Sequence, residues 1–272
     1  MGERKSIEHA GERPATIDSL RADLVGLGLD PGMTVMVHSS LSAHGWVSGG
    51  AVAMILALEL ALGDAGTLVM PTHSTDLSDP AHWQNPPVPQ AWWEVIRETM
   101  PAYDPDLTHT RGMGRIPETF RKQRGVIRSS HPLDSFAARG PNANLICADH
   151  ALDYSLGEGS PLARLYESKG WVLLLGVGHE NNTSLHLAEY RANFASKKEV
   201  ISGAPIMVDG NRRWVKIQDI DLNSDDFGTI GADFERETGY VVHGRVAKGE
   251  ALLMPQRELV DFGVQWMEKH RR

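Results

Sequence analysis

The sequence lacks the cysteines, long apolar runs and basic excess that mark several common classes of protein. Its 272 residues hold one cysteine, Cys147, so neither an intramolecular disulfide nor a cysteine-based zinc cluster is expected, which suits a reducing, cytoplasmic setting. No apolar run approaches the roughly 18 residues that a membrane span needs, and the polar N-terminus does not resemble a signal peptide. A formal net charge of −8 argues against a nucleic-acid-binding surface and suits a cationic small substrate.

Short apolar runs alternate with helical patterns along the chain, which predicts an α/β fold with a central mixed sheet flanked by helices. The turn that starts with Asp209-Gly210 separates two strand-like segments and predicts one of the β-hairpin elements expected near the C-terminus. Predicted strands cover 34–38, 66–70, 171–175, 199–208, 214–217, 240–246 and 251–254. Predicted helices cover 17–27, 51–62, 90–99, 117–122, 142–150, 161–167, 230–238 and 255–270.

The chain is expected to form a single domain over residues 16–272, preceded by a mobile polar lead-in at 1–15. Residues 76–111 differ from the rest, because prolines break up regular structure there and tryptophans alternate with acidic residues. Such an irregular insertion is either a flap that binds substrate or a packed surface loop, and composition does not decide between them.

Polar residues follow the predicted buried strands. His38 and Ser39 end the first strand region, and Thr72 and His73 follow the second. Because ligand sites in open α/β sheets collect beyond the carboxyl ends of the strands, we expect these groups to share one site. Each histidine taken alone could equally be an ordinary loop residue.

The segment Trp171–Arg191 combines a strand, a glycine turn and a helix that Asn182 and Thr183 could cap. On that helix His186 and Glu189 are three residues apart and therefore lie on one face. A histidine beside a carboxylate suits general base catalysis, because the carboxylate orients the ring and stabilises the imidazolium. A surface His–Glu pair of little energetic value is the alternative.

Other chemistries find weaker support. His179, His186 and Glu189 suggest metal ligands, but the sequence contains no H-E-x-x-H, and we expect no metal. No G-x-S-x-G elbow is present, and Cys147 lies outside the polar clusters, so neither a serine nor a cysteine nucleophile is expected. The glycines and arginines of 110–115 suit either an anion site or an ordinary turn. The loop 153–160 is likewise either a solvated turn or part of the site.

Several segments, in order along residues 15–265, together resemble the aminoglycoside 3-N-acetyltransferase family. They are MVHSSLSAHGWVSGG, LVMPTHS, HTRGMGRIPETFR, SSHPLDSFAARGP, GEGSPLARLY and LLLGVGHENNTSLHLAEYRA. The resemblance implies the family's own α/β fold, acetyl-coenzyme A as the acetyl donor, and transfer to the 3-amino group of an aminoglycoside antibiotic. It also implies an antibiotic-resistance role. An acetyltransferase of another amine, or a non-catalytic protein that binds aminoglycosides or coenzyme A, remains the alternative.

The resemblance also implies roles for individual residues. His186 falls on the family's catalytic histidine and Glu189 on its acid, with Thr72 or Ser74 as a hydroxyl that could stabilise the oxyanion. Substrate choice is less defined by the match, because His179-Glu180 stands where relatives vary. The residues expected to bind coenzyme A are His38, Ser39, Ser40, Thr72, His73, Arg111, Gly112, Met113, Gly114 and Arg115. The carboxylates expected to bind the polycationic substrate are Asp76, Asp104, Asp153 and Glu158.

Overall fold

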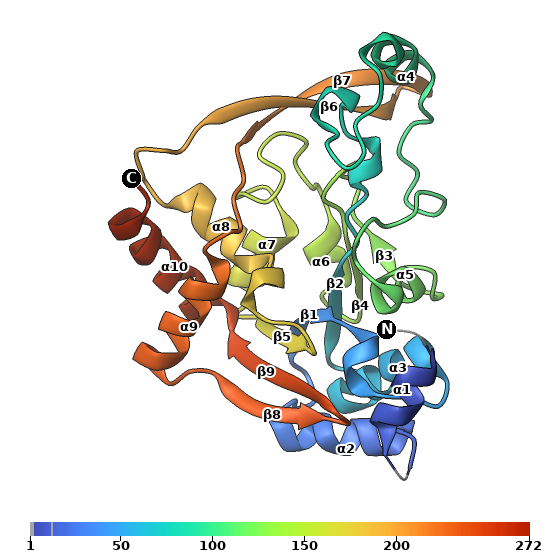
Figure 1. Ribbon diagram of the computed structural model, residues 1–272, viewed down its shortest axis with the longest axis vertical. Helices are drawn as coiled ribbons and strands as arrows, with labels where there is room; N and C mark the ends of the chain where they lie inside the picture. Colours follow the sequence, from blue (N-terminus) through green and yellow to red (C-terminus); the bar gives the residue numbers. More distant parts are fainter. Residues whose placement is uncertain (1–2, 12) are drawn as a thin grey trace.

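The computed structural model, which describes residues 3–11 and 13–272, is built around one seven-stranded sheet with the order β3-β4-β2-β1-β5-β9-β8 (Figure 1). Its strands are β1 (Thr34–Ser39), β2 (Thr67–Pro71), β3 (Ile127–Arg128), β4 (Phe136–Arg139), β5 (Trp171–Leu175), β8 (Val242–Val246) and β9 (Gly249–Pro255). The central strand β1 pairs in parallel with β2 and β5, whereas β4 and β9 add to the sheet antiparallel. The predicted mixed sheet is therefore confirmed.

Helices cover both faces of this sheet because its strand side chains alternate between them. Val35 and Val37 of β1 point to the face covered by α2, α3 and α5, and Met36 points to the face covered by α6 to α10. The helices are α1 (Glu3–Ala10), α2 (Ile17–Leu27), α3 (Gly50–Leu62), α4 (Trp93–Thr99), α5 (Arg115–Phe120), α6 (Ala143–Cys147), α7 (Pro161–Glu167), α8 (Ser184–Arg191), α9 (Phe227–Thr238) and α10 (Gln256–His270). In the part of the chain that the structure describes, no helix is long and apolar enough to cross a membrane.

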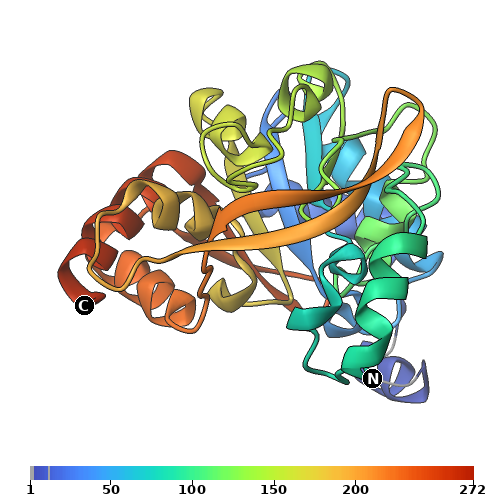
Figure 2. The ribbon, with the colours of Figure 1, turned by 90° about the horizontal axis from the view of Figure 1, so that it is seen from above.

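A separate two-stranded ribbon, β6 (Glu199–Val208) and β7 (Asn211–Ile220), extends from the region of α8 to that of α4 (Figures 1 and 2). Asp209 and Gly210 form its two-residue turn with φ of 49° and 74°, as the hairpin signal predicted. The ribbon holds the irregular segment 76–111, because the Tyr103 N–H donates to the Pro205 carbonyl at 2.9 Å. Tyr103 is itself buried and donates through its hydroxyl to the Ser129 carbonyl. This part of the insertion is therefore a packed loop.

Helix α8 begins at Ser184, and of the two predicted capping residues Asn182 accepts the Ser184 N–H at 3.3 Å, whereas Thr183 makes no side-chain cap. Two predicted boundaries need correction. Helix α5 begins two residues earlier than predicted, and α6 ends at Cys147 rather than at residue 150. The lead-in expected at 1–15 contains helix α1, so it is not irregular throughout, and its mobility stays a prediction.

Candidate active site

The carboxyl ends of β1, β2 and β5 meet at one edge of the sheet, because the three strands are adjacent and parallel. His38 lies at the end of β1, His73 directly follows β2, and His186 lies on α8, which follows β5. These imidazoles are close enough for charge on His73 or His186 to lower the pKa of His38, after the larger effect of burial. The structure thus brings the predicted strand-end histidines together with His186.

His186 and Glu189 form a hydrogen-bonded pair, with Nδ1 of His186 at 2.5 Å from Oε2 of Glu189. The Glu189 side chain is 1% exposed and that of His186 is 17% exposed, which excludes the alternative of a surface pair. The Phe227 ring lies against the imidazole, with 4.8 Å between ring centroids. Since an ionised carboxylate only accepts hydrogen bonds, the pair places the proton on Nδ1 and leaves the Nε2 lone pair for a ligand.

The second oxygen of Glu189 is also engaged. Oε1 accepts a hydrogen bond from Nη1 of Arg271 at 2.5 Å and from the backbone N–H of Asn223 at 3.0 Å. A carboxylate buried to this extent needs such partners, because an unpaired charge in the interior costs several kcal/mol. Both oxygens of Glu189 are therefore fixed, and the carboxylate has one orientation toward His186.

The two strand-end histidines, His38 and His73, have ring nitrogens without a hydrogen-bond partner at this edge. Nε2 of His38, Nε2 of His73 and Oγ of Ser39 are all buried without a hydrogen-bond partner in the protein. Burial lowers the pKa of His38 to about 3 and that of His73 to about 4, so both rings are neutral at pH 7. Ser40, the next predicted residue, bonds within the fold: its N–H donates to the Leu175 carbonyl. Unpartnered polar atoms at a strand edge fit a site that receives a polar ligand.

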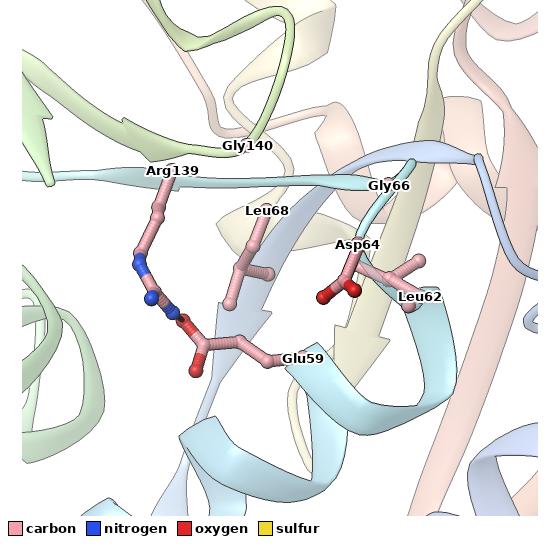
Figure 3. Close-up of a pocket in the computed structure, with 8 residues that line it drawn as sticks. Glu59, Leu62, Asp64, Gly66, Leu68, Arg139 and Gly140 are labelled. Atoms are coloured by element: carbon pink, nitrogen blue, oxygen red, sulfur yellow. Dashed lines mark hydrogen bonds and ion pairs between the residues drawn. The ribbon is translucent and has the colours of Figure 1, made fainter. Parts of the chain in front are cut away.

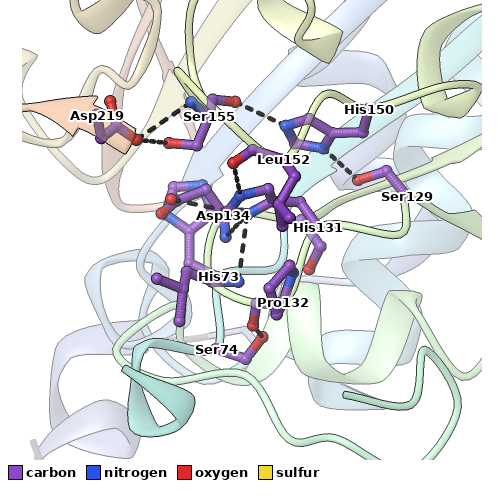
Figure 4. A network of polar contacts seen from close by, with 12 residues as sticks. His73, Ser74, Ser129, His131, Pro132, Asp134, His150, Leu152, Ser155 and Asp219 are labelled. Carbon is purple, nitrogen blue, oxygen red and sulfur yellow. Dashed lines mark hydrogen bonds and ion pairs between the residues drawn. The ribbon is translucent and has the colours of Figure 1, made fainter. Parts of the chain in front are cut away.

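His73 lies at one side of a network of polar contacts (Figure 4). Oδ1 of Asp134 lies 3.8 Å from Nδ1 of His73, which is an ion-pair distance but too long for a hydrogen bond. Nδ1 of His131 accepts the Asp134 N–H at 2.9 Å, and Nε2 of His150 lies 2.6 Å from the Ser155 carbonyl. Burial raises the pKa of Asp134, but the nearby imidazoles of His73 and His131 outweigh it, and the resulting pKa lies below the ordinary value.

The two hydroxyls expected to stabilise an oxyanion have partners inside the protein. Ser74 donates to the Pro132 carbonyl at 2.8 Å, and Thr72 lies 3.2 Å from the Ser135 hydroxyl and 3.3 Å from Nε of Arg128. Both residues are fully buried. We therefore give Thr72 and Ser74 a structural role at the end of β2 rather than one in binding the reacting oxygen.

The glycine–arginine loop 111–115 lies against the same edge. The Arg111 N–H donates to the His73 carbonyl at 2.8 Å, and a Cβ on Gly114 would lie 3.7 Å from the Ser39 carbonyl oxygen. Gly112 and Gly114 have φ of 72° and 84°, which side chains rarely adopt, so glycine is required for this path. Met113 and Arg115 complete the loop, and Arg115 begins α5. The loop predicted for coenzyme A is thus placed beside His73.

The four carboxylates predicted for the substrate all have protein partners. Arg111 pairs with Asp76 at 2.6 Å, and both are 58% exposed; they line a hollow of about 610 Å³ with Trp83. Glu158, 67% exposed, accepts two hydrogen bonds from Arg191 of α8, at 2.6 and 3.0 Å. Two others cap backbone: Asp104 accepts the N–H groups of residues 106 and 107, and Asp153 accepts that of residue 218. Asp104 is thereby committed to its own turn.

A second pocket lies at the opposite end of β2 (Figure 3). It is lined by the Glu59–Arg139 ion pair, with 2.6 Å between Oε1 and Nη1, together with Asp64 and Gly66. Gly66 precedes β2, whereas His73 follows it, so this pocket is remote from the histidine cluster. Within residues 3–11 and 13–272, no group of three or more His, Cys, Asp or Glu side chains is placed to hold a metal ion.

Sequence reasoning did not identify Arg271, Asn223 or Asp134 as site residues. The segment SSHPLDSFAARGP, which contains Asp134, carries part of the family resemblance, but nothing in its spacing indicated that it supports His73. Arg271 lies 82 residues from Glu189 in the chain, and only the folded structure brings the two together.

The sequence and the fold place the chain in a known class of acyltransferase. Residues 36–268 match the model of the aminoglycoside 3-N-acetyltransferase family, and the chain belongs to that family. It is 46% identical to the SPbeta prophage-derived aminoglycoside N(3')-acetyltransferase-like protein YokD of Bacillus subtilis, over 96% of each chain. It is 40% identical to aminoglycoside N(3)-acetyltransferase VII of Streptomyces paromomycinus, over 94% of this chain and 92% of that protein.

Solved structures agree with this membership. The crystal structure of YokD has a TM-score of 0.95 and 45% identity, and the match covers 98% of each chain. AAC-IIIb in a binary complex with CoASH has a TM-score of 0.85 and 34% identity, covering 95% of this chain and 98% of that one. AAC-VIa bound to sisomicin has a TM-score of 0.86 and 30% identity, covering 95% and 99%.

Proposed function

We propose that this protein transfers the acetyl group of acetyl-coenzyme A to the 3-amino group of an aminoglycoside, in a ternary complex with His186 as the general base. The observation that carries the proposal is the buried His186–Glu189 pair at the edge where β1, β2 and β5 end. The family membership supplies the reaction class, and relatives bound to CoASH and to sisomicin support the two substrates.

The proposed step needs one base for the attacking amine and one hydrogen-bond donor for the negative charge that develops on the thioester oxygen. The substrate amine attacks the thioester carbonyl while Nε2 of His186 takes a proton from the amine nitrogen. The new C–N bond forms, the C–S bond breaks, and coenzyme A leaves as a thiolate that takes up the proton from the His186 imidazolium, which restores the base. Glu189 stabilises the imidazolium that forms on His186 and holds the ring in place.

The thioester oxygen requires a hydrogen-bond donor, and the hydroxyls of Thr72 and Ser74 are already engaged. A neutral imidazole with its proton on Nε2 is a suitable donor at a buried site. His73 and His38 are neutral at pH 7 and carry unpartnered Nε2 atoms at this edge. We assign the role to this pair of rings.

The coenzyme A part of the acetyl donor fits the glycine–arginine loop. Arg111 and Arg115 bring positive charge to the edge, and the glycines allow a phosphate group to approach the backbone closely. Ser39, with its unpartnered hydroxyl, lies next to the loop at the end of β1. A donor made inside cells, together with the one buried thiol, also supports a cytoplasmic location.

The polycationic substrate fits the exposed carboxylates around the edge. Asp76 and Glu158 are well exposed, and each neutralises only one arginine, so an ammonium group can join or replace that partner. Asp153 is also exposed and lies in the loop that contacts β7. We propose these three as substrate contacts and assign Asp104 a smaller part, because its carboxylate caps a turn.

Mass spectrometry of the products tests the function. The protein is incubated with acetyl-coenzyme A and a panel of aminoglycosides and unrelated amines, and the acetylated position is assigned by NMR. We expect a singly acetylated aminoglycoside modified at the 3-amino group. Acetylation of an unrelated amine alone would show a different substrate. Tight binding without any acetylated product would show a non-catalytic protein.

A further inference from the structure

The last turn of the chain reaches the proposed catalytic pair. Helix α10 ends at His270, and Arg271 follows it with its N–H still bonded to the Met267 carbonyl at 2.9 Å. Figure 1 marks the C-terminus at the end of α10, beside the segment that leads from α8 to β6. Phe194 of that segment lies under the guanidinium, 5.2 Å from its carbon to the ring centroid. The family match ends at residue 268, so Arg271 lies beyond it.

Arg271 is held firmly by groups other than Glu189. Nε and Nη2 donate to the two carboxylate oxygens of Asp226 at 2.8 and 2.5 Å, and Nη2 also donates to the Asn223 carbonyl at 2.8 Å. The side chain is 10% exposed. A planar guanidinium fixed at three of its donor groups presents its remaining nitrogen in one direction, which a flexible lysine cannot do.

That remaining nitrogen, Nη1, points at Glu189 and lies 2.5 Å from Oε1. The order of groups is therefore Asp226, Arg271, Glu189 and His186, each in contact with the next. The groups that face Glu189 are His186 on its own helix, Arg271 from the chain end, Lys197 from the segment after α8 and the Asn223 N–H from the loop before α9. The imidazoles of His38 and His73 face His186 from the ends of β1 and β2.

We propose that Arg271 is a positioning residue for the transfer reaction: it fixes the Glu189 carboxylate that turns His186 correctly, and its positive charge offsets the attraction of that carboxylate for a further proton on the ring. Without the guanidinium, the buried carboxylate carries an uncompensated charge, and the His186–Glu189 pair takes up a proton more readily. A protonated pair has no base to offer. The proposal rests on the proposed function, because it acts through His186.

The kinetic test replaces Arg271 with methionine or lysine and measures kcat and KM against pH. In Arg271→Met we expect kcat at pH 7 to fall about tenfold, a change of about 1.4 kcal/mol in the barrier. The acid limb of the profile moves to higher pH, KM changes little, and activity recovers in alkaline solution. Arg271→Lys keeps the charge and therefore keeps the acid limb in place. Arg272→Ala, at the exposed neighbouring residue, is the matched control and behaves as the wild type.

A measurement without substrates separates this role from a merely structural one. The proton between Nδ1 of His186 and Glu189 resonates far downfield in the NMR spectrum and is assigned by its loss in Glu189→Gln. The chemical shift of this signal changes when the pair takes up a further proton. We expect that change to occur at a higher pH in Arg271→Met than in the wild type and in Arg272→Ala.

The outcomes are distinguishable. A folded Arg271→Met protein with the wild-type pH profile and the wild-type proton signal would overturn the role of Arg271 while leaving the proposed function intact. Should the methionine variant fail to fold, Arg271→Gln takes its place, and a wild-type acid limb in that neutral variant would overturn the role instead. Turnover that survives in His186→Ala would overturn the role of His186 as the base, and the role of Arg271 with it, whereas a wild-type protein that forms no acetylated aminoglycoside would overturn the proposed function itself.

Discussion

Gly231 of α9 lies directly against His179, so that a Cβ at position 231 would come within 1.9 Å of the His179 ring carbon Cγ. His179 is in the short helix η5 (His179–Asn181), which links β5 to the helix that carries His186. The same imidazole is 2.9 Å from Oε1 of Glu235, also on α9. The close approach of α9 thus fixes the turn that delivers the proposed base.

Gly231→Ala should therefore destabilise the protein although alanine favours helices. Overpacking of a tight contact costs about 1–3 kcal/mol, more than the gain of about 0.5–1 kcal/mol from replacing glycine in a helix. Gly228→Ala is the matched control on α9, because a Cβ there meets nothing within 4 Å. Urea unfolding should show opposite signs for the two variants. Equal stabilisation by both would contradict the close contact.

The buried neutral histidines predict how stability depends on pH. Burial lowers the pKa of His38 and His150 to about 3 and that of His73 to about 4, below the ordinary 6.5. Between pH 4 and 6.5 the unfolded chain therefore binds protons that the folded protein does not. The free energy of unfolding must fall as pH falls through this window, by up to about 1.4 kcal/mol per pH unit for each histidine.

Urea unfolding at pH 7, 6 and 5 measures this slope. His150→Gln should reduce it by the contribution of one histidine, whatever the variant does to stability at pH 7. Stability that stays constant from pH 6.5 to pH 4.5 would show that these imidazoles are not held neutral.

The single cysteine should be inert in the folded protein. Cys147 is 5% exposed, burial raises the pKa of its thiol to about 12, and its Sγ lies 3.4 Å from the Ile127 carbonyl. Because the thiolate is the reactive form, a thiol reagent at pH 8 should not label the native protein and should label it fully in urea. Rapid labelling of Cys147 in the native protein, with loss of activity, would contradict this prediction and would favour a cysteine nucleophile.

Strands β1, β2 and β5 were predictable because each is a short apolar run that is followed by a glycine or a polar residue, whereas the two-residue strand β3 was not predicted. The predicted strand 171–175 coincides with β5, and 34–38 lies within β1. Strand order was not predictable, since the placement of β9 beside β5 depends on contacts between segments about 80 residues apart. Of the two capping residues that the sequence offered for α8, the structure uses Asn182 and not Thr183.

The candidate site was also predictable only in part. His186 and Glu189 could be paired from their spacing on one helix, and the strand-end histidines from the rule that parallel strands deliver polar groups to one edge. The spacing could not show that Glu189 is buried, because its cover comes from Arg271 and Asn223 in distant segments. Nor could composition show that the carboxylates of Asp104 and Asp153 are bound to backbone N–H groups.

The central claim is that His186 is the general base, and the turnover of His186→Ala with acetyl-coenzyme A and an aminoglycoside tests it most directly. His82→Ala serves as the control, and calorimetry establishes that each variant still binds coenzyme A. We predict that His186→Ala binds coenzyme A as the wild type does and loses about 10²–10⁴-fold in turnover. Near-normal turnover in His186→Ala would contradict the account.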